Sequence, residues 1–377
     1  MKIGVVVHGP NIIDSGYGQK IIELLKEYGN VSAKLGGTMG RTAVIDKSLE
    51  NSIDISEKLV PSQSLKYFHD QDKDIIFLLN YGKSSVTGQV FGYKVTSNYF
   101  KKIKNNDIPI IQIERPGESD GSIILWNGDA EEIVEKIADQ LKLNIVTPSE
   151  IYSNHFNEDY EDSTSKRLIH GVSSGENIMV NGVIIGKATE DNITLIADDG
   201  IIVDIKGGKI KSHGIEKLGK IDLNNAVVKT GLLRKSNVSP RIMKKTKRNT
   251  NFKIGFLNHA GEDVYSYNDF DLVVSVGDDT TLISSDILYR FDIPVIGITD
   301  GDLDKVVEHG FKSNDSIIFK VSQGFDDVVG HKIHEKIFKR KNCLEMDQFQ
   351  YRQELINYIK DEIIEILNNM NSKYIIE

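Results

Sequence analysis

Residues 270–298 constrain the fold more than any other segment of this chain. A short apolar run ends in Gly277, and the tetrapeptide Asp-Asp-Thr-Thr follows at 278–281. A helical pattern then leads to a second apolar run, Ile293–Ile298. Strand, short polar turn, helix and strand form the βαβ arrangement, which places backbone N–H groups and a helix N-terminus before a bound anion. The segment therefore predicts a parallel α/β sheet with a ligand site beside Gly277.

The composition is that of an ordinary globular protein with two or three domains. Of the 377 residues, 39% are hydrophobic and 27% are charged. A chain of this length can bury a large hydrophobic core. The net charge of −9 argues against a nucleic-acid surface, and we expect the short basic run at 241–248 to be solvated. Cys343 is the only cysteine, which excludes an intrachain disulfide. With neither a leader pattern nor a long apolar run, we expect a cytoplasmic protein with no membrane partner.

Strand and helix patterns predict two Rossmann-like α/β lobes bridged by a small all-β module, with a C-terminal helix. Alternating strand and helix patterns are typical of a mostly parallel sheet. Asn-Gly, Asp-Gly and Gly-Gly turns between short strands instead predict antiparallel hairpins. The expected divisions are a first α/β lobe (1–148), a polar linker (149–168), the β module (169–235), a basic linker (236–251), a second α/β lobe (252–340) and the C-terminal amphipathic helix (350–372).

An internal repeat links the two lobes. The pattern Lys-Ile-Gly-x-x-x-His at 2–8 recurs at 253–259. Asp-Ile-Pro followed by two apolar residues occurs at 107–111 and again at 292–296. In both lobes an apolar strand introduced by aspartate lies between these segments. The shared order favours a duplication with an insertion in the first lobe, and the alternative is chance recurrence.

Glycine-rich polar turns follow most of the predicted strands. Because the carboxyl ends of parallel strands meet at one edge, we expect these turns to line a ligand cleft between the lobes. Glycines at 36–40 let the backbone approach an oxyanion, and neighbouring side chains add donors. The alternative is a plain glycine turn with Arg41 in solvent. The candidate ligand- or phosphate-binding residues are Gly36, Gly37, Thr38, Gly40, Arg41, Thr42, Lys83, Ser84, Arg115, Gly277, Thr280 and Thr281.

Histidine and aspartate residues at the same turns are the candidates for chemistry. His8 and His259 occupy matching positions in the repeat, as acid/base groups or donors to phosphate; ordinary core hydrogen bonding is the alternative. Carboxylate oxygens suit Mg²⁺ carried with a phosphate. No histidine or cysteine spacing typical of a transition-metal site is present. The catalytic candidates are Asp278, His259 and His8, and the metal candidates are Asp278, Asp279, Asp300 and Asp302.

Residues 271–282, with the strand at 293–298, resemble the phosphate loop of the NAD kinase, diacylglycerol kinase and phosphofructokinase superfamily. That loop has the pattern Gly-Gly-Asp-Gly-Thr after a strand. The resemblance implies that Asp278 activates or orients an acceptor hydroxyl. Two positions depart from the pattern: Val276 replaces the first glycine and Asp279 the last. A carboxylate at Asp279 would repel phosphate unless Mg²⁺ intervened.

Nearly the whole chain resembles an uncharacterised protein family of methanogenic archaea with no assigned function. The resemblance implies a cytosolic methanogen protein and supplies no catalytic residues. The residues that carry it are His8-Gly-Pro and the segments 35–46, 78–83, 112–117, 180–186 and 276–281.

Together these features predict binding of a nucleotide or another small phosphorylated ligand. If the protein is an enzyme, Mg²⁺-dependent, kinase-like phosphoryl transfer is the expected reaction. One alternative is a non-catalytic sensor of a nucleotide or of an anionic methanogenic cofactor. Another is an interaction protein that works through its β module and C-terminal helix, and a homo-oligomer is compatible with each of these.

Overall fold

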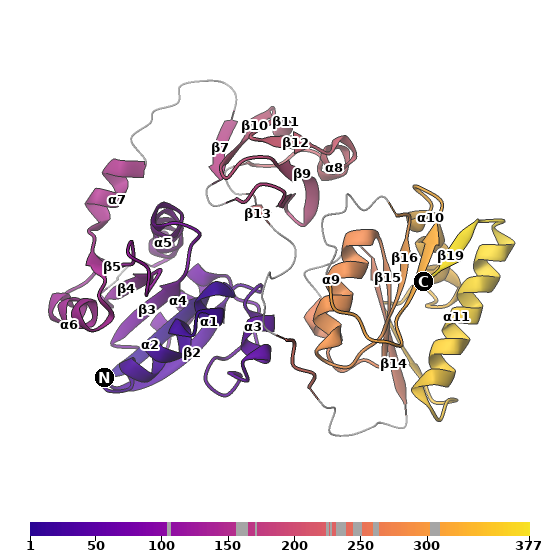
Figure 1. Ribbon diagram of the computed structural model, residues 1–377, viewed down its shortest axis with the longest axis horizontal. Helices are drawn as coiled ribbons and strands as arrows, with labels where there is room; N and C mark the ends of the chain where they lie inside the picture. The colour runs from indigo at the N-terminus through magenta and orange to yellow at the C-terminus, as the bar shows by residue number, and fades with distance from the viewer. Residues whose placement is uncertain are drawn as a thin grey trace. The chain divides into compact units, whose positions relative to one another are not determined.

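The computed structural model divides into two compact units. The first unit comprises 1–178, 185–226 and 234–239, and the second comprises 179–184, 227–233 and 240–377. Figure 1 traces the chain, and each unit is described by itself. The described residues are 1–103, 107–155, 165–169, 172–223, 226, 228–230, 239–243, 251–258, 264–301 and 310–377.

A six-stranded sheet forms the centre of the first unit, in the order β2-β1-β3-β4-β5-β6. Strands β2, β1, β3 and β4 are parallel, and β5 is antiparallel to β4. The chain passes from β1 to β2 on one side and then to β3 on the other, so the strand order reverses between β1 and β3. The strands are β1 Lys2–His8, β2 Asn30–Gly36, β3 Ile75–Asn80, β4 Ile110–Glu114, β5 Ser122–Asn127 and β6 Asn144–Ile145.

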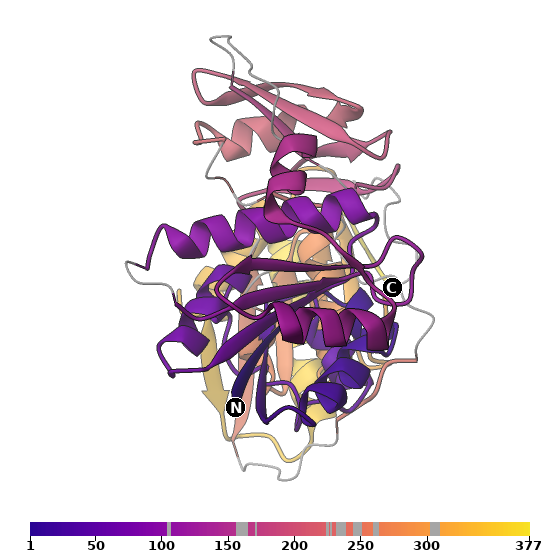
Figure 2. The same ribbon diagram turned by 90° about the vertical axis from the view of Figure 1, so that its left-hand side faces the viewer.

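Helices cover both faces of this sheet. One core joins α1, α2, α3 and α6 to the sheet, and the other joins α4, α5 and α7 to the opposite face. Figure 2 shows α5 and α6 on opposite sides of the strands. Every residue of β3 is buried, as expected of a strand covered on both faces. The helices are α1 Asn11–Asp14, α2 Tyr17–Leu25, α3 Arg41–Asp46, α4 Pro61–His69, α5 Ser85–Phe100, α6 Glu131–Leu141 and α7 Pro148–His155.

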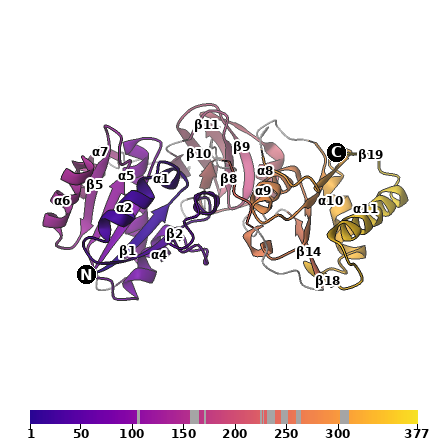
Figure 3. The same cartoon turned by 60° about the horizontal axis from the view of Figure 1, so that its bottom comes forward.

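The second unit contains another six-stranded sheet, in the order β18-β14-β15-β16-β17-β19. Its four central strands are parallel, and both edge strands are antiparallel to them. Helices α10 and α11 share a core with one face, and Figure 3 shows the long α11 beside this sheet. The elements are β14 Phe252–Asn258, η1 Val264–Tyr267, β15 Leu272–Val276, α9 Asp278–Tyr289, β16 Val295–Thr299, β17 Ile317–Val321, α10 Asp326–Lys336, β18 Cys343–Met346, α11 Arg352–Asn369 and β19 Tyr374–Ile376.

The repeat predicted from the sequence has a structural counterpart in three adjacent strands of each sheet. The Lys2 backbone N donates to Asp74 Oδ2 at 2.6 Å, and the Lys253 N donates to Asp271 Oδ2 at 2.9 Å. In both sheets the aspartate N–H donates back to the lysine carbonyl at 2.9 Å. The strand pairings that follow also have the same register in the two sheets. The shared pattern therefore covers β1-β3-β4 in one sheet and β14-β15-β16 in the other.

The β module forms two small sheets, in the orders β11-β10-β7 and β12-β9-β8-β13. Its hairpins turn as predicted, because Asn181, Gly182, Asp199 and Gly200 all have positive φ. The elements are β7 Ser165–Ile169, β8 Asn177–Val180, β9 Val183–Ala188, β10 Ile193–Asp198, β11 Ile201–Lys206, β12 Gly208–Ile210, α8 Ser212–Leu218 and β13 Val228–Thr230.

The structure corrects the polar linker expected at 149–168 at both of its ends. The first end is helical, because Thr147 and Glu150 form a capping box before α7: Thr147 N donates to Glu150 Oε2 at 2.7 Å, and Glu150 N donates to Thr147 Oγ1 at 3.3 Å. The other end is strand β7, which pairs with β10.

Two further predicted boundaries concern the end of the second lobe and the basic linker. The second lobe extends past residue 340, because β18, α11 and β19 pack on its sheet. The basic linker expected at 236–251 lies largely outside the described residues. Across the described ranges, no helix combines the length and apolar character needed to cross a membrane.

Candidate functional site

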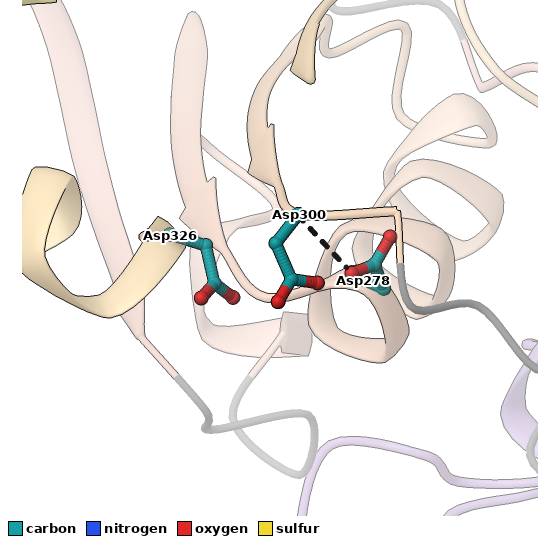
Figure 4. Close-up of side chains that lie close together, drawn as sticks. All are labelled: Asp278, Asp300 and Asp326. Atoms are coloured by element: carbon teal, nitrogen blue, oxygen red, sulfur yellow. Dashed lines mark hydrogen bonds between the residues drawn. The ribbon is translucent and has the colours of Figure 1, made fainter. Parts of the chain in front are cut away.

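Three aspartates meet at the carboxyl edge of the second unit's sheet. Asp278, Asp300 and Asp326 each offer a carboxylate oxygen, and these oxygens lie within 4.8 Å of one another (Figure 4). The three residues follow β15, β16 and β17, which are adjacent parallel strands. We call this group the aspartate trio. Parallel pairing brings the three strand ends together, so residues far apart in sequence share one site.

Local backbone geometry orients the trio. Gly277 has a φ of +96°, which only glycine adopts readily, and it directs the chain from β15 into α9. The backbone N of Asp300 donates to Asp278 Oδ2 at 3.3 Å. The backbone N of Gly324 donates to Asp300 Oδ2 at 2.7 Å. Asp326 is the first residue of α10.

The chemistry of the trio favours a hard cation. Asp278 is buried, and Asp300 and Asp326 are half-buried. At this separation each pair of ionised carboxylates repels by about 3.5 kcal/mol or more at an effective dielectric constant of about 20. A divalent cation among the oxygens reverses that repulsion, and Mg²⁺ takes carboxylate oxygens together with water and phosphate oxygens.

The trio contains two of the predicted metal residues and one that sequence reasoning missed. Asp278 and Asp300 were candidates, whereas Asp326 was not. Asp326-Asp327 is an aspartate pair like Asp278-Asp279, but Phe325 separates it from Gly324, whereas Asp278 follows Gly277 directly. Asp279 lies in the first turn of α9 outside the trio. Asp302 and His259 lie outside the described residues.

The hydroxyl candidates of α9 face inward. Thr281 Oγ1 lies 2.8 Å from Ser275 Oγ of the neighbouring strand, and both residues are buried. Gly297 has no side chain where Thr281 packs, and a Cβ there would overlap it. Thr280 is also buried, and its carbonyl accepts a hydrogen bond from Ser284 Oγ at 2.6 Å. The Thr281 hydroxyl thus holds α9 against the sheet.

A chain of hydrogen-bonded polar side chains lies at the carboxyl edge of the first sheet. His8 Nδ1 lies 2.8 Å from Asn80 Oδ1, and Asn80 Nδ2 donates to Glu114 Oε2 at 2.7 Å. These residues end β1, β3 and β4, so the His8–Asn80 bond spans the point where the strand order reverses. In open α/β sheets that point is the usual ligand position.

The hydrogen-bond directions fix the histidine tautomer. Because the Asn80 amide N donates to Glu114, the Asn80 oxygen faces His8, and His8 Nδ1 must be the donor. In the neutral imidazole, Nε2 is then an acceptor. Burial lowers the pKa of His8, although the bond to Asn80 opposes that shift, so the neutral form is favoured. The ring stacks on Phe91, with centroids 4.1 Å apart.

Glu114 anchors this chain without any exposed surface. Besides the Asn80 amide, it accepts hydrogen bonds from Gly82 N at 2.6 Å and Gln112 Nε2 at 2.8 Å. Burial raises the pKa of Glu114, and the three N–H donors oppose that shift. Two glycines on α5 make room, because a Cβ at Gly88 would overlap the Glu114 carboxyl group and one at Gly92 would overlap the Gln112 amide.

The glycine turn after β2 lies beside His8. A Cβ built on Gly37 would lie 3.6 Å from His8 Cδ2 and 3.9 Å from Nε2, so this edge of the ring faces the turn. Two amides of the turn are used internally, because Gly37 N donates to Leu59 O and Arg41 N donates to Thr38 O. Arg41 is only 5% exposed, which excludes the alternative that placed it in solvent.

The remaining candidates in the turns of the first unit are buried or already take part in caps, ion pairs or hydrogen bonds. Gly36, Gly40 and Thr42 are buried, and Gly40 is the N-cap of α3. Lys83 Nζ forms an ion pair with Glu176 at 2.7 Å, and Ser84 caps α5 by accepting from Thr87 N. Arg115 Nε pairs with Asp120 at 2.9 Å, and its Nη1 donates to Gly82 O at 2.7 Å. Phosphate binding by these residues stays a prediction.

The fold and the two polar edges define a two-unit α/β protein, with the aspartate trio on one sheet and the hydrogen-bonded chain of His8, Asn80 and Glu114 on the other. The chain belongs to the family described as uncharacterized protein conserved in archaea (DUF2117), which matches residues 5–341. It is 47% identical over 380 residues to the uncharacterized protein MJ0065 of Methanocaldococcus jannaschii, covering 99% of each chain. No solved structure matches the chain significantly. The archaeal family resemblance is confirmed, and the kinase-loop resemblance stays a prediction.

Proposed function

We propose that this protein binds a phosphorylated, nucleotide-like ligand together with Mg²⁺ at the aspartate trio, and that phosphoryl transfer is the reaction this site serves. The observation that carries the proposal is the convergence of three aspartates from three adjacent strand ends, each with one carboxylate oxygen within 4.8 Å of the others.

The charge at this edge supports a metal-bound rather than a bare phosphate. Helix α9 directs its N-terminus to the site, but Asp278 and Asp279 occupy its first turn. Helix dipoles favour anions at such a position, whereas two carboxylates repel them. Mg²⁺ removes the conflict, because it binds carboxylate and phosphate oxygens at once. Phosphoryl transfer depends mainly on such positioning and charge neutralisation.

The test is thermal unfolding of the full chain with ATP, GTP, NAD, NADP or coenzyme A, each with and without Mg²⁺. A ligand at about 100 times its Kd adds roughly 2.7 kcal/mol of stability. We expect a shift that requires both Mg²⁺ and a phosphorylated ligand. Phosphate or nucleoside diphosphate release, measured on the ligand that shifts the protein, then separates transfer from binding alone.

Asp300→Asn is the decisive variant and Asp327→Asn its control. Both remove one carboxylate, but Asp327 is next to Asp326 on α10 and outside the trio. Asp300→Asn should abolish the Mg²⁺-dependent shift without lowering the metal-free melting temperature, since it relieves repulsion. Asp327→Asn should behave like the wild type. A shift that is independent of Mg²⁺, or equal in the two variants, would contradict the proposal.

A further inference from the structure

The first unit carries a polar edge that the magnesium site does not explain. His8, Asn80 and Glu114 form one hydrogen-bonded chain at the reversal of strand order, and each bond in it is 2.8 Å or shorter. Burying a carboxylate and an imidazole costs stability unless both are fully bonded. A purely structural role would be served as well by apolar side chains at these strand ends.

Of the three hydrogen-bonded side chains, only His8 is partly exposed. Glu114 and Asn80 are buried, whereas His8 is only partly buried. With Nδ1 committed to Asn80, the imidazole offers Nε2 on the edge that faces Gly37. Gly37 has a φ of +97° and is partly exposed. Because it has no side chain, the space that a Cβ at this position would fill, 3.9 Å from His8 Nε2, is open.

The Nε2 acceptor favours a ligand group that donates a hydrogen bond over a bare anion. The Nε2 lone pair repels the unprotonated oxygens of a phosphate, and the Gly37 amide is already bonded to the Leu59 carbonyl. A hydroxyl group can donate to Nε2, and its carbon can occupy the space beside Gly37. The geometry therefore differs from the phosphate loop expected for this turn.

We propose that the carboxyl edge of the first sheet is a separate binding site for a polyhydroxylated, sugar-like ligand, one hydroxyl of which donates to His8 Nε2. Asn80 and Glu114 are positioning residues that hold the imidazole ring so that Nε2 faces the ligand. This site involves the first unit alone, so it does not rest on the function proposed for the aspartate trio.

The experiment measures modification of His8 by diethyl pyrocarbonate, which attacks a neutral, reachable imidazole nitrogen, with mass spectrometry of the full chain near neutral pH. D-ribose at molar concentration is the ligand probe, and inorganic phosphate is the anionic probe. We expect His8 to react, ribose to suppress the reaction several-fold and phosphate to leave it unchanged. His213, whose side chain is 75% exposed, should react equally in all three conditions.

Gly37→Ala tests the geometry, and Gly16→Ala is its matched control. Gly16 has a φ of +81°, so both variants carry similar backbone strain, but a Cβ at Gly16 meets nothing within 4 Å. Gly37→Ala should protect His8 from modification, and Gly16→Ala should not. An unreactive His8, protection by phosphate, or no protection by ribose would overturn the proposal. These wild-type results decide it even if Gly37→Ala fails to fold.

Discussion

Replacing Gly88 by alanine tests whether the buried carboxylate of Glu114 sets the position of α5. In an isolated helix the change is favourable, because alanine stabilises a helix interior by about 1 kcal/mol relative to glycine. Here the new Cβ would overlap the carboxyl group of a side chain with no exposed surface. Either α5 moves away from β4, or Glu114 rotates out of its hydrogen bonds.

The hydrogen bonds give the magnitude. Glu114 accepts from Asn80 Nδ2, Gly82 N and Gln112 Nε2 at 2.6–2.8 Å. A bond to a charged group contributes about 1.5–3 kcal/mol, so losing two of the three costs roughly 3–6 kcal/mol. Subtracting the gain in helix propensity leaves a net loss of about 2–5 kcal/mol. In a unit of this size that lowers the melting temperature by at least about 4 °C.

Thermal unfolding followed by circular dichroism measures this effect. Asn98→Ala is the control, because Asn98 is exposed on the same helix and the change tests alanine propensity without the contact. It should leave the melting temperature unchanged or slightly raised. A Gly88→Ala protein as stable as the wild type, or more stable, would refute the claim that α5 is seated on the Glu114 carboxylate.

Three further predictions concern stability. The pKa of His8 is lower in the folded protein than the unfolded value of about 6.5. The stability that the neutral, buried imidazole contributes is therefore present above about pH 6.5 and is lost as the pH falls through the folded pKa. Replacing His8 by glutamine should reduce the loss of stability to urea between about pH 8 and pH 5. Thr147→Ala removes the capping box of α7 and should cost about 1 kcal/mol in thermal unfolding, whereas the exposed Ser153→Ala should not. Asp74→Ala and Asp271→Ala each remove one bond to a lysine N–H, and each should lower urea stability by about 1–3 kcal/mol; a loss in only one would deny their equivalence.

The parallel core was predictable because its signals are local. Nearly continuous apolar runs bounded by glycine and aspartate mark β3, β15 and β16, and the repeated lysine and aspartate positions mark where the strands pair. The hairpins of the β module were equally visible, since Asn-Gly and Asp-Gly permit positive φ. The carboxyl-edge rule then placed Asp278 and Asp300 at one edge.

The hydrogen-bonded chain of His8, Asn80 and Glu114 was harder to predict, because it depends on a strand pattern that repeats every two residues and on a helix pattern that repeats every four. Gln112 and Glu114 alternate along β4 and so point to the same face. Gly88 and Gly92 are four apart on α5 and so also share a face. Each pattern alone is unremarkable, and only tertiary packing brings the glycines over the polar pair. Asp326 was harder to predict, because it does not directly follow a strand: β17 ends at Val321 and Asp326 is the first residue of α10.

The repeat places different side chains at equivalent positions of the two sheets. Asn80 lies six residues after Asp74, and Gly277 lies six residues after Asp271, so the two positions correspond. Gly277 has no side chain, and the backbone there turns into α9. Counted from the shared prolines, Glu114 corresponds to Thr299, and the next position is Arg115 in one sheet and Asp300 in the other. The first sheet thus buries its carboxylate behind an amide and presents a neutral acceptor, whereas the second places its carboxylates at the edge. Because the strand register is the same, the two proposed sites differ through the side chains at these positions rather than through the fold.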